Sequence, residues 1–169
     1  MSAEWELLGE TSLSSSGESL QLTSLSAKDY LQITFDLFPS GSNNSANLRF
    51  NNDSGGTSYS RRENQDFSTT DGLGTNRDKI DFVGGSTGGC LAQIFVGQSD
   101  GEVKLCYCQV VDKVTTGTGA AANIGEARYV WGKWTNKTTY INQVDIFDSD
   151  YTSGWAAGSN MCVYGADNQ

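Results

Sequence analysis

Histidine is absent from this chain of 169 residues, and proline occurs only once. Without an imidazole, the Ser-His-Asp and Cys-His catalytic arrangements are excluded, together with most zinc and iron sites. No apolar run approaches the roughly 18 residues that a membrane-spanning helix needs, so we expect no membrane span. The opening MSAEWELLGE is acidic and lacks an apolar segment, so we expect no secretory signal.

Basic residues are also scarce, with 11 Lys and Arg against 20 Asp and Glu and a net charge of −9. Nucleic-acid phosphates are bound by clustered Lys and Arg, so the composition predicts no nucleic-acid partner. No internal repeat, linker or composition break divides the chain. We therefore predict a single domain spanning residues 1–169.

The four cysteines are Cys90, Cys106, Cys108 and Cys162. Cys106 and Cys108 project from the same face of one predicted strand, which does not favour a bridge between them. There is no CxxC pair and no histidine partner, so we expect no zinc site. The sequence predicts free thiols in a protein made in a reducing cytoplasm.

Alternation of apolar and polar residues is the dominant pattern, and it predicts β-strands. In residues 30–37, Leu31, Ile33, Phe35 and Leu37 alternate with polar side chains. Further strands are predicted in residues 4–10, 19–25, 47–51, 79–83, 91–97, 102–111, 127–135, 141–147 and 161–165. Nine or ten strands separated by Gly-, Ser-, Asn- and Asp-rich turns indicate an all-β sandwich or barrel.

Two of these strands carry specific predictions about side-chain direction. In residues 102–111, the pattern places Val103, Leu105, Tyr107 and Val111 on one face and Lys104 on the opposite face. In the last strand, Met161 and Val163 are predicted to face the core, with Cys162 and Tyr164 on the other side of the sheet.

Residues 53–78 are the longest stretch without a clear strand, and long loops are often functional. At the start of this stretch, Asn51, Asp53 and Gly55 faintly resemble a calcium loop, but its other acidic positions are missing. An Asx-type turn is the better prediction. Arg61 and Arg62 form the only adjacent basic pair; they either face water or bind an acidic patch on a partner.

Three carboxylates, Asp145, Asp148 and Asp150, lie at the end of a predicted strand. We interpret them as a solvated strand end. The alternative is a calcium cluster, because calcium takes oxygen ligands in such loops.

Aromatic side chains offer a possible sugar-binding platform, although core and interface packing is the favoured interpretation. Alternation places Trp131 and Tyr129 on the face opposite Trp134. The set comprises Trp5, Trp131, Trp134, Trp155, Tyr129, Tyr140 and Tyr151.

Three segments occur in a characteristic order: LRFNNDSGGTSYS, WGKWTNKTTYINQVDIFDS and GWAAGSNMCVYGAD. In this order they resemble a group of small virion structural proteins from tailed bacteriophages. The resemblance implies an antiparallel, jelly-roll-like β-sandwich located in the virion. It further implies a capsid decoration or cement protein that binds and stabilises the major capsid protein shell as a homo-oligomer, either a trimer or a dimer.

We expect the contacts with the shell to come from residues 53–78, residues 112–127 and the segment around Trp5. No enzymatic activity, catalytic residue, metal or cofactor is expected. The alternative function is a tail-associated receptor-binding module that recognises glycans through Trp131 and Trp134. A carboxylate-based hydrolase is a third hypothesis, but no pair of residues supports it.

Overall fold

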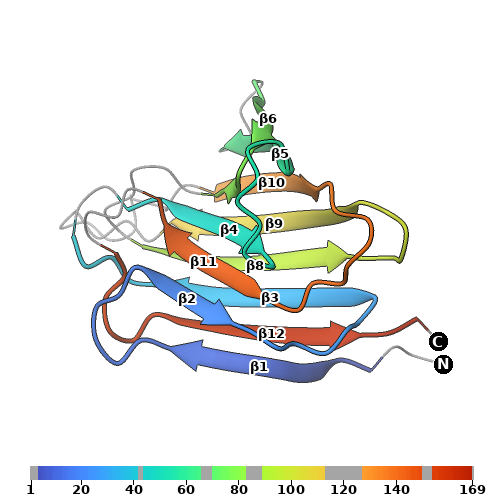
Figure 1. The fold of residues 1–169 in the computed structure, drawn as a ribbon. Coiled ribbons are helices and arrows are strands. Elements are labelled where there is room, and N and C mark those ends of the chain that lie inside the picture. The colour runs from blue at the N-terminus through green and yellow to red at the C-terminus, as the bar shows by residue number, and fades with distance from the viewer. Residues whose placement is uncertain are drawn as a thin grey trace.

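A computed structural model describes residues 4–41, 44–65, 70–82, 89–112, 127–149 and 154–168. These residues form twelve strands in two packed antiparallel sheets, and they contain no helix (Figure 1). The described part of the chain therefore has no helix able to span a membrane. The predicted all-β antiparallel sandwich is confirmed, with twelve strands in place of the nine or ten expected.

The larger sheet has eight strands and the smaller sheet has four. The larger has the order β1 (Glu6–Ser12), β12 (Asn160–Ala166), β3 (Tyr30–Leu37), β8 (Cys90–Gly97), β9 (Lys104–Asp112), β10 (Ala127–Trp134), β5 (Tyr59–Gln65) and β6 (Gly72–Arg77). The smaller has the order β2 (Ser19–Leu22), β11 (Val144–Asp148), β4 (Ala46–Phe50) and β7 (Ile80–Asp81). The chain crosses repeatedly between the sheets, so residues far apart in sequence share one core.

The core lies between the two sheets, and its side chains come from alternate positions of the strands. On β3, Leu31, Ile33, Phe35 and Leu37 are all buried, as predicted. The smaller sheet contributes Leu20, Leu48, Phe50 and Ile146 from the other side. In Figure 1 the smaller sheet lies obliquely across the middle of the larger one, so within the described residues it covers one face of that sheet.

The closing strand β12 is paired on both sides, with β1 and with β3. Met161 and Val163 are fully buried, whereas Cys162 and Tyr164 are half-buried on the outer face. The predicted direction of these side chains is confirmed, and β12 is an integral strand of the larger sheet.

The predicted division of β9 into two faces is confirmed, with Lys104 opposite Leu105, Tyr107 and Val111. Its core side chains are Lys104, Cys106, Cys108 and Val110, whereas Leu105, Tyr107 and Val111 point outward. Both faces of this strand are apolar, so alternation alone could not choose between them. The Lys104 amine donates hydrogen bonds to the carbonyl oxygens of Ser99 (3.0 Å) and Glu102 (3.1 Å), and these bonds offset the cost of burying it.

The expected long loop in residues 53–78 contains a β-hairpin formed by β5 and β6. These strands are rich in polar residues and lack the apolar alternation that marks a strand in sequence. The hairpin projects beyond the sandwich in Figure 1. Of the second expected contact loop, residues 113–126 lie outside the described residues.

Candidate binding surface

The outer face of the larger sheet carries an ordered grid of side chains. The pairing of β3, β8, β9 and β10 aligns outward-pointing residues into two adjacent rows. The first row is Gln32, Phe95, Tyr107 and Trp131, and the second is Thr34, Gln93, Gln109 and Tyr129. We call these eight residues the platform; it contains four aromatic side chains, three glutamines and one threonine.

Three aromatic rings of the platform lie close together, with Tyr107 between Trp131 and Tyr129. The Tyr107 and Trp131 ring centroids are 5.9 Å apart, and the Tyr107 and Tyr129 centroids are 6.4 Å apart, with the latter rings 17° from parallel. Gln109 Nε2 donates a hydrogen bond of 3.0 Å to Tyr107 Oη and so holds the central ring. Phe95 and Trp131 remain 42% and 46% exposed.

No residue of the platform is charged, although the protein has a net charge of −9. Two cations border the platform on the same face. Arg62 on β5 lies opposite Trp131 and is paired with Asp71, and Lys133 lies two residues from Trp131 on β10. Around the platform, Leu91, Leu105 and Val111 are each about half exposed. Contiguous apolar surface of this kind marks interaction sites.

The two edges of the larger sheet carry further exposed apolar side chains. The outermost strands are β1 and β6. Leu7 on β1 is 51% exposed, and Leu73 on β6 is 75% exposed. Trp5, immediately before β1, is also exposed.

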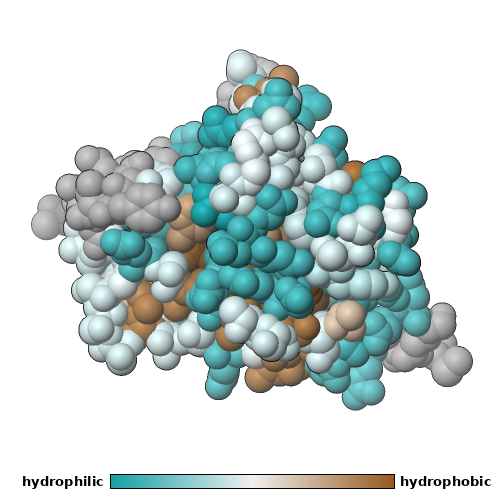
Figure 2. Space-filling model, in the orientation of Figure 1, coloured by the Kyte–Doolittle hydropathy of each residue, from teal (hydrophilic) through white to brown (hydrophobic). Residues whose placement is uncertain are grey.

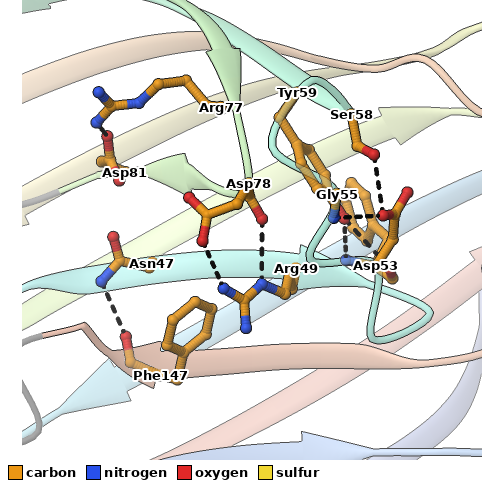
Figure 3. Close-up of polar contacts among 11 residues, drawn as sticks. Asn47, Arg49, Asp53, Gly55, Ser58, Tyr59, Arg77, Asp78, Asp81 and Phe147 are labelled. Atoms are coloured by element: carbon orange, nitrogen blue, oxygen red, sulfur yellow. Dashed lines mark hydrogen bonds and ion pairs between the residues drawn. The ribbon is translucent and has the colours of Figure 1, made fainter.

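The outer face of the smaller sheet is different, because its polar groups are already paired with each other. Arg49 donates to the Asp78 carboxylate at 2.8 Å, and its guanidinium carbon lies 4.4 Å from the Phe147 ring centroid (Figure 3). A hydrophilic band crosses the centre of this side of the molecule in Figure 2. Arg49 and Asp78 on this face are therefore bound to each other.

The Asx turn predicted at Asp53 is confirmed. Its Oδ1 accepts hydrogen bonds of 2.9 Å from the Gly55 amide and the Ser58 hydroxyl (Figure 3). Its Oδ2 accepts one of 2.7 Å from Trp134 Nε1. Burial raises the pKa of the Asp53 carboxyl, but these hydrogen bonds outweigh it and the pKa lies below its ordinary value. The carboxylate is committed to the turn.

The interpretation of Asp145 and Asp148 as a solvated strand end is wrong, because both are buried. Asp145 Oδ1 accepts from Gln21 Nε2 at 2.6 Å, and Asp148 accepts from the backbone amides of Ser45 and Gly154 at 3.1 Å. They accept hydrogen bonds from protein donors, which accounts for two buried carboxylates. Asp150 lies outside the described residues.

Arg61 does not face water, in contrast to one of its two predicted alternatives. Its side chain is only 15% exposed, forms an ion pair with Glu63, and donates to Asp81 at 3.2 Å. Arg62 on the opposite face is 62% exposed. The adjacent pair therefore splits across the strand, as the period of two requires.

Trp131 and Trp134 lie on opposite faces of β10, as alternation predicted. Trp134 and Trp155 are core residues, whereas Trp5 and Trp131 are exposed. Tyr151 lies outside the described residues. The sequence prediction missed Phe95 and Tyr107 as neighbours of Trp131, because only strand register brings them together; the available signal was their outward alternation.

All four cysteines are free, as predicted, and three of them are buried. Within the described ranges, no three Cys, Asp or Glu side chains are grouped so that they could hold a metal ion.

The chain matches none of the protein-family models compared and none of the curated proteins. Two solved structures of Scytalido-glutamic peptidase, each with a transition-state analog, are 14% and 15% identical to it, with TM-scores of 0.34 and 0.35. They cover 88% of this chain and 74% and 75% of the peptidase chains. A structure of the HCR/D W1238A mutant is 10% identical, covers 99% of this chain and 43% of its own, and has a TM-score of 0.24. Similarity at this level carries no argument about function.

Proposed function

We propose that this chain is a structural protein of a tailed-bacteriophage virion, a non-enzymatic capsid decoration protein that binds the major capsid protein shell as a dimer or trimer. The observation that carries the proposal is the open larger sheet, whose outermost strands β1 and β6 both expose apolar side chains. A protein that reinforces a shell needs a stable body and more than one surface for neighbours. The two edges provide such surfaces at opposite ends of one sheet.

The β1 edge suits addition to a neighbouring sheet. An edge strand presents unpaired N–H and C=O groups, and strand addition uses these groups for affinity and side chains for specificity. Leu7 and the preceding Trp5 supply exposed apolar contacts there. Symmetric pairing of such an edge produces a closed homo-oligomer.

The β5–β6 hairpin suits contact with the shell because its strands are fixed to the sandwich. Arg61 and Arg77 both form ion pairs with Asp81 on β7, a strand of the smaller sheet. Leu73 is thereby presented on an anchored strand, and a fixed surface loses less conformational entropy on binding than a flexible one.

The decisive experiment adds purified protein to shells that lack it and measures the copies bound per particle. We expect many copies per shell and a raised temperature of shell disruption. Leu73→Asp should reduce binding at least about tenfold, a change of about 1.4 kcal/mol. Leu105→Asp is the matched control, because Leu105 is similarly exposed but lies away from both edges.

Failure of the wild-type protein to bind shells would overturn the proposal. A copy number of only a few per particle would move the protein to the tail. An equal loss of binding in Leu105→Asp would remove the hairpin from the contact surface.

A further inference from the structure

We infer that the platform binds neutral oligosaccharides. This inference does not depend on the proposed attachment to a capsid, because the platform lies on the outer face of the larger sheet and the proposed contacts lie at its edges. It assigns a ligand class to a surface that shell binding leaves free.

The rings of the platform supply the apolar part of sugar recognition. An aromatic face carries partial negative charge, whereas the C–H bonds on one side of a pyranose ring carry partial positive charge, so the two surfaces attract. Phe95, Tyr107 and Trp131 stand side by side on adjacent strands in one row. They form a line of rings on a hydrogen-bonded sheet.

Glutamines beside the rings supply the polar part. An amide offers two N–H donors and one C=O acceptor, which matches hydroxyl groups that both donate and accept. Within the described part of the chain, the side chains of Gln32 and Gln93 make no hydrogen bond to protein, so both amides are available to a ligand. Gln109 keeps its carbonyl oxygen as an acceptor while its N–H group holds Tyr107.

Charge selects the class of ligand. All eight platform residues are neutral, whereas the protein as a whole is strongly acidic. An anionic polysaccharide would find no cation among them and would be repelled by the net charge, and a cationic partner would find no carboxylate. A neutral chain of hydroxyl-bearing rings complements this surface.

The dimensions of the platform favour a chain of sugars over a single ring. Four adjacent strands span about 14 Å, and residues two apart on a strand are separated by about 7 Å. The platform is therefore an elongated, shallow strip. Several weak contacts along it would add up to a measurable affinity.

The experiment uses the full chain and a panel of soluble neutral glucans, mannans and galactans, with dextran sulfate as the charged comparison. Binding is measured by calorimetry at low and high salt. We expect at least one neutral polysaccharide to bind with little dependence on salt. Dextran sulfate should not bind.

Variants then locate the site. Trp131→Ala should weaken binding at least tenfold, and Gln93→Ala several-fold. Leu73→Asp on the hairpin is the control and should leave sugar binding unchanged, whereas Trp131→Ala should leave shell binding unchanged. Circular dichroism and thermal unfolding verify that each variant is folded.

Three results would overturn the inference: no binding to any neutral member of the panel, binding only to dextran sulfate, or binding that survives in the folded Trp131→Ala variant. A concentration-dependent dimer abolished by Trp131→Ala and unaffected by sugars would instead assign the platform to a second copy of the chain.

Discussion

The indole Nε1 of Trp134 donates a hydrogen bond of 2.7 Å to Asp53 Oδ2, which ties the end of β10 to the turn after β4. The bond joins the two sheets through a buried indole and a carboxylate. Asparagine at position 53 has only one side-chain oxygen to accept from the three donors on Gly55, Ser58 and Trp134, and its N–H₂ group cannot accept a hydrogen bond. We expect Asp53→Asn to lower the free energy of unfolding by about 1.5–3 kcal/mol, measured by urea denaturation at pH 7.

The same carboxylate predicts a pH dependence. Because the folded pKa of Asp53 is lowered, its stabilising contribution is present above the unfolded value of about 4 and is lost as pH falls through the folded value. The difference in stability between the wild type and Asp53→Asn should therefore shrink below about pH 4. Glu102→Gln, at an exposed position, is the control for replacing a carboxylate with an amide. A difference independent of pH would show that the charge is not responsible.

Gly132 on β10 faces the core between Cys106 and Ile80. A Cβ atom there would lie 2.5 Å from Cys106 Sγ and 2.6 Å from Ile80 Cδ1 on β7. Gly132→Ala should therefore cost about 1–3 kcal/mol through overpacking. Gly97→Ala is the matched strand control, because a Cβ at Gly97 has no atom within 4 Å. Equal thermal unfolding temperatures for the two variants would contradict this packing.

Thiol reactivity should distinguish the four cysteines. Burial raises the pKa of Cys106 to about 12 and that of Cys108 well above its ordinary value. Cys162 is half-buried on the outer face. At pH 8 we expect one rapid equivalent of iodoacetamide labelling in the native protein, lost in Cys162→Ser, and four equivalents in denaturant. Rapid labelling of a second cysteine would show that the core opens readily.

Val163 on β12 is fully buried, so Val163→Asp places an unpaired carboxylate in the core. We expect a loss of about 4 kcal/mol or more and aggregation on expression. Tyr164→Asp, one residue along the same strand but on the outer face, should be much less destabilising.

Removal of residues 159–169 should also cause aggregation, because the edges of β1 and β3 would lose their partner. A folded deletion variant would show that β12 is dispensable.

The sequence predicted the elements with one polar and one apolar face. On β3 and β8 the core residues alternate strictly with polar or exposed ones, so both the strands and their direction were correct. On β9 the pattern predicted the two faces but not which of them is buried, because Leu105 and Tyr107 are as apolar as Cys106 and Cys108 and only the surrounding strands decide. No sequence pattern predicts that two backbone carbonyl oxygens accept hydrogen bonds from the Lys104 amine.

The hairpin and the platform depend on relationships between strands. β5 and β6 are polar, and their ion pairs with Asp81 join segments that no local pattern links. Trp131 was recognised as an outward aromatic residue. The neighbours of Trp131 could not be predicted, because the register that places Tyr107 beside it arises from pairing between β9 and β10.

The position of β12 between β1 and β3 has a consequence for synthesis of the protein. The larger sheet cannot be assembled in the order in which its strands leave the ribosome, since β1 has no partner within that sheet until residues 160–166 have been made. Until then, one side of β3 is also open. Before residues 160–166 are made, the position between β1 and β3 is empty, and another strand could pair there incorrectly. Insertion of β12 is therefore a late folding step that pairs segments far apart in sequence. Translation pauses or chaperone contacts should therefore matter most before this step.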